Sequence, residues 1–299
     1  MKKNFMTLFA SALLVGFTFA SCGSDNDEAK NDGEGPNKGG DTGGYVMSDD
    51  AKASLEGSDY FVFQMDDATF LGLKEAGKIK ADLRIDGAYA GEGEDPDPEI
   101  DKKIKMDIWE NTMTGMPGTD INFYGQDNLI RLQIAGNDWY GGGYNTPANR
   151  LPDAFKLKEI DTNPADYYLH IAIKSNDKGD CSHRIILTYG NILDENGNMM
   201  QGEGVANSGV VVLGNKAIDG RTPYKDFARD GEWTSINIPI SKFYQSGDKQ
   251  ATFGYNIPDW QTNADGTNPC IYFFSFSGPN AQAGKSLIFD AVFIYKKKK

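Results

Sequence analysis

The stretch SLIFDAVFIY at residues 286–295 decides the fold, because it has the pattern of a β-strand that is apolar on both faces. Strict alternation places one set of side chains on one face: Leu287, Phe289, Ala291, Phe293 and Tyr295. The opposite face then carries Ile288, Asp290, Val292 and Ile294. Such a strand is covered on both sides, as in the middle of a sandwich. Asp290 is the exception, since a buried carboxylate requires N–H donors, a basic partner or a cation.

Short apolar or alternating segments recur along the rest of the chain, separated by turns rich in Gly, Asn and Asp. Strands are expected at 60–66, 78–86, 104–110, 129–134, 167–174, 184–189, 209–213, 233–240, 251–257 and 271–276. Helical spacing is restricted to a turn within 48–58 and to residues 151–160. With 35 glycines and 12% aromatic residues, the pattern favours an all-β fold, a β-sandwich of the jelly-roll type rather than a closed barrel.

The N-terminus has the layout of an exported lipoprotein. Lys2 and Lys3 precede an apolar run that ends in Ala20-Ser21-Cys22. We therefore expect residues 1–21 to be a lipoprotein signal peptide and Cys22 to be lipidated; the alternative is an ordinary signal peptide with an incidental cysteine. Residues 22–44 are polar and Gly-rich and are expected to form a flexible tether, followed by a single domain at 45–299.

Charge and motif content exclude several classes of function. The chain has 30 basic and 43 acidic residues, and a net charge of −13 argues against nucleic-acid binding. No nucleophile elbow, zinc-protease or P-loop motif is present, and the two histidines, His170 and His183, lack metal-ligand spacing, so an enzyme is not expected. A glycosidase carboxylate pair remains open, as does a disulfide between Cys181 and Cys270.

Two C-terminal motifs carry a resemblance to a known family. EWTSINIPISKF at 232–243 and FDAVFIYK at 289–296 resemble the end of galactose-binding-like β-sandwiches. With NFYG at 122–125, NDWYGGGY at 137–144 and ADYYLHIAIKSND at 165–177, the chain more closely resembles surface glycan-binding lipoproteins of Sus-like polysaccharide-utilisation systems.

This resemblance implies non-catalytic capture of a polysaccharide or oligosaccharide. The protein would be lipid-anchored in the outer membrane at the cell surface, near a glycan transporter and glycosidases. Two alternatives remain open, a surface adhesin or assembly component and a glycoside-processing enzyme.

Aromatic side chains are the candidates for sugar contact, because the C–H faces of sugar rings stack on Trp and Tyr. Alternation in 104–110 turns Trp109 away from the core, and the other candidates lie in a glycine-rich loop expected at 137–144 or in a polar loop around Trp260. The candidates are Trp109, Trp139, Tyr140, Tyr144 and Trp260. For each of them the alternative is a packing role, and Trp233 is expected to pack in the core or at a sheet edge.

Asp66 and Asp290 form a candidate metal pair. They could approach each other if the first and last strands are neighbours, and carboxylates are ligands for a structural Ca²⁺ ion. The alternative is a hydrogen-bonded aspartate without a metal.

Overall fold

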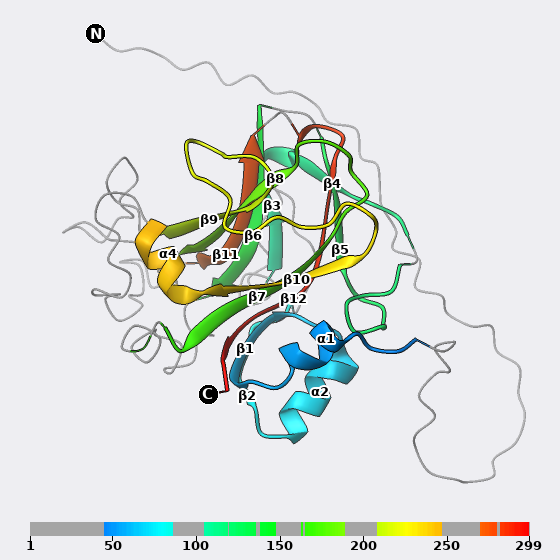
Figure 1. Cartoon of the computed structure of the whole chain (residues 1–299), viewed down its shortest axis with the longest axis vertical. Helices are drawn as coiled ribbons and strands as arrows, with labels where there is room; N and C mark the ends of the chain where they lie inside the picture. The colour runs from blue at the N-terminus through cyan, green and yellow to red at the C-terminus, as the bar shows by residue number, and fades with distance from the viewer. Residues whose placement is uncertain are drawn as a thin grey trace, which may run out of the picture. The chain divides into compact units, whose positions relative to one another are not determined.

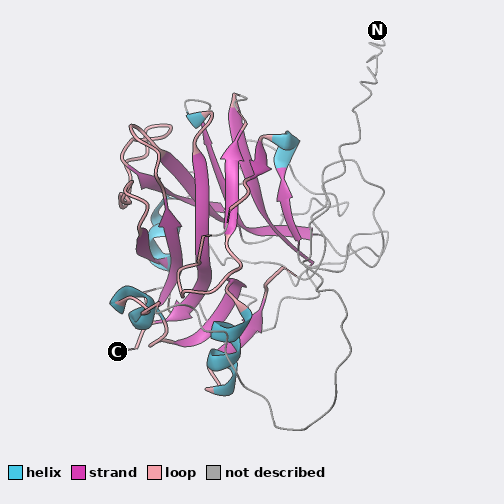
Figure 2. Ribbon diagram, turned by 90° about the vertical axis from the view of Figure 1, so that its right-hand side faces the viewer, coloured by secondary structure: helices cyan, strands magenta, loops and turns pink. Residues whose placement is uncertain are grey.

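The computed structural model describes residues 45–85, 105–118, 120–135, 138–147, 163, 165–188, 208–246, 270–279 and 282–298. In these residues, two sheets pack face to face around one apolar core (Figures 1 and 2). The prediction of an all-β sandwich is confirmed. The expected segments at 1–44, 151–160 and 251–257 lie outside the described residues.

The first sheet has the closing strand β12 in its interior. Its strand order is β10-β7-β12-β1-β2, with β5 pairing β12 and β4 pairing β5. The bounds are β1 Ser58–Gln64, β2 Ile79–Asp82, β4 Met113–Gly115, β5 Ile130–Ile134, β7 Tyr167–Lys174, β10 Trp233–Pro239 and β12 Ser286–Lys296. Strand β1 pairs antiparallel with β12 and parallel with β2. Because β12 pairs with β1, β5 and β7, the C-terminal strand holds this sheet together.

The second sheet contains a strand that the sequence did not predict. Its order is β3-β6-β11-β8-β9. The bounds are β3 Lys105–Ile108, β6 Trp139–Pro147, β8 Ser182–Thr188, β9 Ser208–Gly214 and β11 Cys270–Pro279. The segment at 137–144, expected to be a glycine-rich loop, supplies most of β6. Pairing with β3 and β11 on its two sides outweighs the low strand propensity of its three glycines.

Both faces of the first sheet are covered by apolar side chains. The core between the sheets takes Phe61 and Phe63 of β1, whereas Tyr60 and Val62 pack in a second cluster on the other face. That second cluster includes residues of α1 (Asp49–Ser54), α2 (Asp67–Glu75) and the 122–125 segment. Strand β12 also contributes residues to both clusters, so the prediction that 286–295 is covered on both sides is confirmed.

The helices were predicted only in part. The turn expected within 48–58 is α1, but α2 was not expected, although Asp66 caps it by accepting a hydrogen bond from the Thr69 N–H at 2.8 Å. A short helix, α4 (Ile240–Ser246), follows β10 directly, where one further strand residue was expected. Among the described residues, no helix is long and apolar enough to cross a membrane.

A bulge in β12 corrects the predicted alternation of the closing strand. The register with β7 shifts between Asp290 and Phe293, and Ala291 has a left-handed φ of 53°. Before the bulge, Leu287 and Phe289 face the core between the sheets; after it, the even-numbered Val292 and Ile294 do. Ala291, Phe293 and Tyr295 lie in the second cluster. The expectation that all odd-numbered residues share one face is wrong, because one extra residue reverses the alternation.

The bulge predicts an unusual sensitivity at Ala291. Ala291→Val should lower the free energy of unfolding by about 2 kcal/mol or more, since a β-branched residue is strained at positive φ and has no room in a fully buried position. Denaturant unfolding measures this loss. Ala172→Val, at an equally buried position in β7, is the matched control for overpacking alone, and an equal loss in both variants would contradict a backbone effect.

Candidate functional site

Two partly exposed tryptophans form a pair where β3 ends and β6 begins. Trp109 opens a 3₁₀ turn, η1 (Trp109–Asn111), directly after β3, and Trp139 is the first residue of β6. Their ring centroids lie 6.3 Å apart with an interplanar angle of 42°. Alternation in 104–110 correctly turned Trp109 away from the core, although its backbone belongs to the turn rather than to the strand.

The position of this pair depends on Gly141. A Cβ atom built there would lie 2.5 Å from Cε3 of Trp109 and 2.8 Å from Cζ3 of Trp139, so both rings cover the glycine backbone. At Gly142 a Cβ atom would instead meet Ile108 and Phe276, which belong to the core. Since neighbouring strand residues face opposite sides, the tryptophans lie on the outer face of the second sheet.

Thr112 joins the two elements that carry the pair. Its buried hydroxyl donates to the Trp109 carbonyl at 2.8 Å and accepts from the Gly141 N–H at 3.1 Å. The η1 turn is thereby fixed against β6 at the point where the rings meet. Sequence reasoning did not identify Thr112, because its partner on β6 is distant in the chain.

Polar side chains lie beside the pair on the same face. Gly141 pairs with Ser277 of β11, which in turn pairs with Arg184 of β8. Arg184 Nη1 donates to Ser277 Oγ at 3.4 Å, and Nη2 forms an ion pair with Asp219. These residues were also missed, because the order of β6, β11 and β8 cannot be read from the chain.

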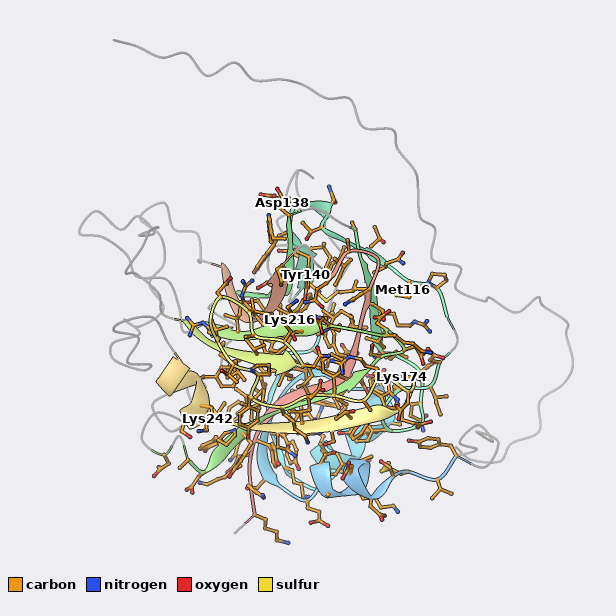
Figure 3. The ribbon with its side chains drawn as sticks, turned by 45° about the horizontal axis from the view of Figure 1, so that its top comes forward. Met116, Asp138, Tyr140, Lys174, Lys216 and Lys242 are labelled. Carbon is orange, nitrogen blue, oxygen red and sulfur yellow. The ribbon has the colours of Figure 1, made fainter. Side chains whose placement is uncertain are left out.

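The structure contradicts the prediction for Tyr140 and Tyr144. Both rings are fully buried in the core between the sheets, so neither can stack on a sugar. The Tyr144 hydroxyl donates to Gln64 Oε1 at 3.2 Å, and the Tyr140 hydroxyl lies 2.6 Å from Nδ1 of His183. Figure 3 shows Tyr140 well inside the end of the sandwich at which Asp138 lies. Alternation along β6 sends the tyrosines inward and Trp139 outward.

The remaining sequence candidates divide into two groups. Trp260 and Cys22 lie outside the described residues. Trp233 packs edge-on against Phe123 at 6.3 Å and beneath the Lys174 ammonium at 5.8 Å, which confirms the expected sheet-edge role.

Asp290 is fully buried and contacts the 122–124 segment. Its Oδ2 accepts a hydrogen bond from the Phe123 N–H at 3.1 Å, whereas Oδ1 has no partner among the described residues. Burial raises the pKa of Asp290 to about 7, and nearby Asp66 adds to the increase. Asn122 holds this segment in shape by accepting from the N–H groups of Tyr124 and Gln126.

The two carboxylates of the predicted calcium site both reach this segment. Asp66 accepts from the Thr69 N–H with Oδ1 and from Asn122 Nδ2 with Oδ2, at 2.8 and 3.3 Å. N–H donors therefore contact three of the four carboxylate oxygens, which supports the hydrogen-bonded alternative. No group of three His, Cys, Asp or Glu side chains among the described residues could hold a metal ion. A calcium ion here stays a prediction of the sequence.

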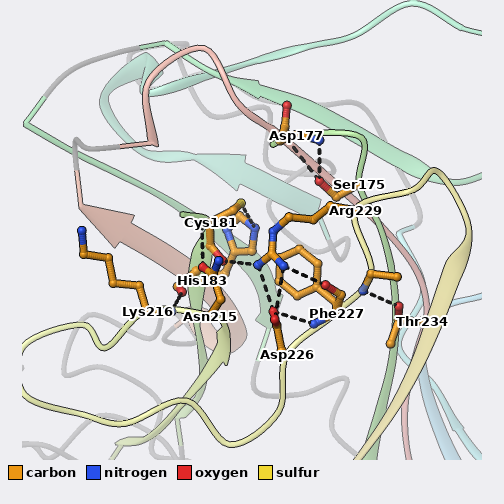
Figure 4. A network of polar contacts seen from close by, with 12 residues as sticks. Ser175, Asp177, Cys181, His183, Asn215, Lys216, Asp226, Phe227, Arg229 and Thr234 are labelled. Carbon is orange, nitrogen blue, oxygen red and sulfur yellow. Dashed lines mark hydrogen bonds and ion pairs between the residues drawn. The ribbon is translucent and has the colours of Figure 1, made fainter. Parts of the chain in front are cut away.

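Cys181 and His183 form a second buried polar cluster (Figure 4). The Cys181 sulfur lies 3.5 Å from Nε2 of His183, and Arg229 donates to the Cys181 carbonyl at 2.9 Å. Burial raises the pKa of the thiol to about 11 and lowers that of the imidazole to about 3, so the pair stays neutral and does not supply a thiolate nucleophile. Cys181 is a free cysteine among the described residues, and the side chain of Cys270 lies outside them.

His170 is a structural histidine that is hydrogen-bonded through both ring nitrogens. Its Nδ1 lies 2.6 Å from the Ala291 carbonyl oxygen and its Nε2 lies 3.0 Å from Ser235 Oγ. Since a carbonyl can only accept, Nδ1 carries the proton. Burial lowers the pKa of this imidazole to about 4, so it is neutral at physiological pH.

Comparisons with known proteins return distant structural likenesses. No family model matches the chain, and no curated protein matches it. A family 30 carbohydrate-binding module is 14% identical, with a TM-score of 0.36 over 64% of this chain and 91% of that one. A family 11 carbohydrate-binding module from Clostridium thermocellum, in complex with a beta-1,3-1,4-mixed-linked tetrasaccharide, is 15% identical, with a TM-score of 0.32 over 64% of this chain and 88% of that one.

An exo-beta-agarase is similar at the same level, with 11% identity and a TM-score of 0.33 over 65% of this chain and 23% of that one. Because these TM-scores lie below 0.5, the likenesses do not decide what the chain binds.

Asp290 should make stability depend on pH. The pKa of Asp290 rises from 3.8 in the unfolded chain to about 7 in the folded protein. The contribution of this carboxyl group to the free energy of unfolding is therefore fully present below pH 3.8 and is lost as the pH rises to about 7. Asp290→Asn cannot ionise and should gain stability relative to the wild type across that window. Melting temperatures of both proteins from pH 4 to 8 measure this gain, and a pH-independent difference would contradict it.

Proposed function

We propose that this chain is a non-catalytic, lipid-anchored surface protein that binds a polysaccharide or oligosaccharide at the Trp109–Trp139 pair. The observation that carries the proposal is the placement of two partly exposed indole rings over Gly141, on the outer face of a sheet. Large aromatic rings that gather outside a core can take the apolar face of a sugar ring. The fold, which packs Tyr140 and Tyr144 inward, leaves these tryptophans outside.

The neighbouring groups suit the hydroxyls of a sugar. Arg184 and Asp219 supply guanidinium and carboxylate groups on the same face, and the buried Ser277 hydroxyl holds Arg184 in place. Arg184 is paired with Asp219, so the site carries no uncompensated positive charge from that arginine, and the net charge of −13 disfavours polyanions. These features favour a neutral glycan.

The anchor and the cellular setting rest on the N-terminal sequence and on the family resemblance. A lipidated Cys22 and the polar segment 22–44 would hold the domain at the outer membrane surface. Tethering raises the local concentration of glycan for a neighbouring transporter and glycosidases. The paired pKa shifts at Cys181 and His183 support a non-catalytic role for that cluster.

Replacing either tryptophan tests the sugar site. Trp109→Ala and Trp139→Ala should each lose about 1–3 kcal/mol of binding free energy, because a stacking ring is removed, with a small change in melting temperature. Affinity-gel electrophoresis against a panel of neutral polysaccharides measures binding. Gly141→Ala keeps both rings but pushes a Cβ atom into them, so it should weaken binding as well.

Trp233→Phe is the matched control, because Trp233 packs at an edge of the other sheet and its loss should leave gel retardation unchanged. If the two alanine variants melt far below the wild type but keep its affinity in the folded fraction, the tryptophans are packing residues and the proposal fails. Failure of the wild type to bind any polysaccharide would favour an adhesin or assembly role.

Cys22→Ala tests the anchor. The variant should leave the membrane fraction or accumulate as an unprocessed precursor, because the acylated thiol is missing. Fractionation and immunoblotting of cells that express the full-length chain detect either outcome. Membrane association and processing like those of the wild type would contradict lipidation, and Ser24→Ala is a control within the same segment.

A further inference from the structure

The register of three adjacent strands places Trp109, Trp139 and Arg184 on one line across the second sheet. Gly141 of β6, which lies beneath the tryptophan pair, is directly opposite Ser277 of β11, and Ser277 is directly opposite Arg184 of β8. Two strand spacings of about 4.8 Å put Gly141 and Arg184 roughly 10 Å apart. That separation exceeds the width of one pyranose ring.

These residues share the outer face of the sheet. Gly278 and Phe276, the neighbours of Ser277, face the core, since a Cβ atom at Gly278 would strike the Tyr140 ring and Phe276 is buried there. Ser277 therefore faces outward, and the 3.4 Å contact from Nη1 places the Arg184 side chain on the same side. In the register of these described strands, the positions between the tryptophans and Arg184 are Gly141 and Ser277, which are both small.

Arg184 is suited to orient a hydroxylated chain. Its side chain is 20% exposed and is held on both sides, by Ser277 and by Asp219, which comes from the segment after β9. A fixed guanidinium presents several N–H donors in one plane, and the adjacent carboxylate, which is 70% exposed, accepts from hydroxyl groups. Together the two groups can donate to and accept from one sugar residue.

We propose that Arg184 and Asp219 form a second subsite for the glycan that stacks on Trp109 and Trp139. The preferred ligand is then an internal stretch of a linear, neutral glycan that runs across β6, β11 and β8, rather than a single terminal sugar. This inference rests on the proposed function, because it extends the same site. It assigns a specificity role to Arg184, which contacts the ligand beyond the reach of the aromatic pair.

Chain length separates this arrangement from a one-ring site. The probes are the mono-, di-, tri- and tetrasaccharides released from the neutral polysaccharide that gives the strongest gel retardation, titrated calorimetrically against the folded domain with its tether. The trisaccharide should bind at least about tenfold more tightly than the monosaccharide, since only the longer chain reaches both subsites. Arg184→Gln should remove most of this length-dependent gain and leave monosaccharide affinity within about twofold.

Lys216→Gln is the matched control, because it breaks another ion pair, the exposed one with Asp180, in the segment that also carries Asp219. Lys216→Gln should change neither the monosaccharide affinity nor the trisaccharide affinity. Asp219→Asn keeps the shape but removes the carboxylate, and should lower trisaccharide affinity selectively. Melting temperatures within a few degrees of the wild type show that these variants are folded.

Two results overturn the inference while the proposed function stands: equal affinity for mono- and trisaccharide, or an Arg184→Gln loss that is the same for both. Tighter binding of a polygalacturonate oligosaccharide than of the neutral chain would contradict the inference that the preferred glycan is neutral. If the wild type binds no glycan of any length, the proposed function fails, and the second subsite fails with it.

Discussion

The left-handed backbone at Ala291 is the constraint on which the sandwich depends. It inserts one extra residue into β12, and that residue reverses which side chains face each layer. With the bulge, Leu287 and Phe289 before it, and Val292 and Ile294 after it, all pack between the sheets. Two hydrogen bonds hold the backbone in this conformation. His170 Nδ1 donates to the Ala291 carbonyl, and the Phe123 N–H donates to Asp290 Oδ2.

The NFYG segment is tied to this constraint from the second cluster. Asn122 organises the turn by side-chain hydrogen bonds and also donates to Asp66, the cap of α2. Phe123 packs against His170 with ring centroids 5.6 Å apart. The helix cap, the turn and the bulge in the last strand thus form one buried polar network between segments far apart in the sequence. This network holds β12 in the first sheet, in the register that turns Leu287, Phe289, Val292 and Ile294 toward the core between the sheets.

In the second sheet, three consecutive glycines of β6 determine where the candidate site lies. Gly141, Gly142 and Gly143 meet different neighbours on alternate faces: the tryptophan pair, the core and Ser275. A side chain larger than hydrogen would collide at each of these positions, so glycine is what allows β6 to lie between close neighbours on both faces. The segment expected to be a loop is therefore a closely packed strand, and Gly141 leaves the space in which Trp109 and Trp139 lie.

Sequence reasoning recovered what depends on local patterns. It placed β7 at its observed bounds, it expected β10 and β12 within one residue, and it identified Asp290 as a carboxylate in need of donors. It missed what depends on contacts between distant segments. The sequence of 286–295 does not indicate that Ala291 has a left-handed backbone conformation, because alanine is not specific to that conformation. Arg184 and Ser277 become neighbours only through the order of β8 and β11.

Burial shifts the pKa values of the two titratable side chains at the bulge, His170 and Asp290, so that their contributions to stability depend on pH in opposite directions. The pKa of His170 falls from 6.5 to about 4, so its contribution to stability is present above pH 6.5 and is lost as the pH falls through that window. The pKa of Asp290 rises to about 7, so its contribution is lost as the pH rises across nearly the same window. As the pH rises from about 4 to 6.5, the contribution of Asp290 falls while that of His170 grows, so the two changes offset each other. A buried histidine and a buried carboxyl near a single strand distortion therefore reduce the pH dependence that either would impose alone.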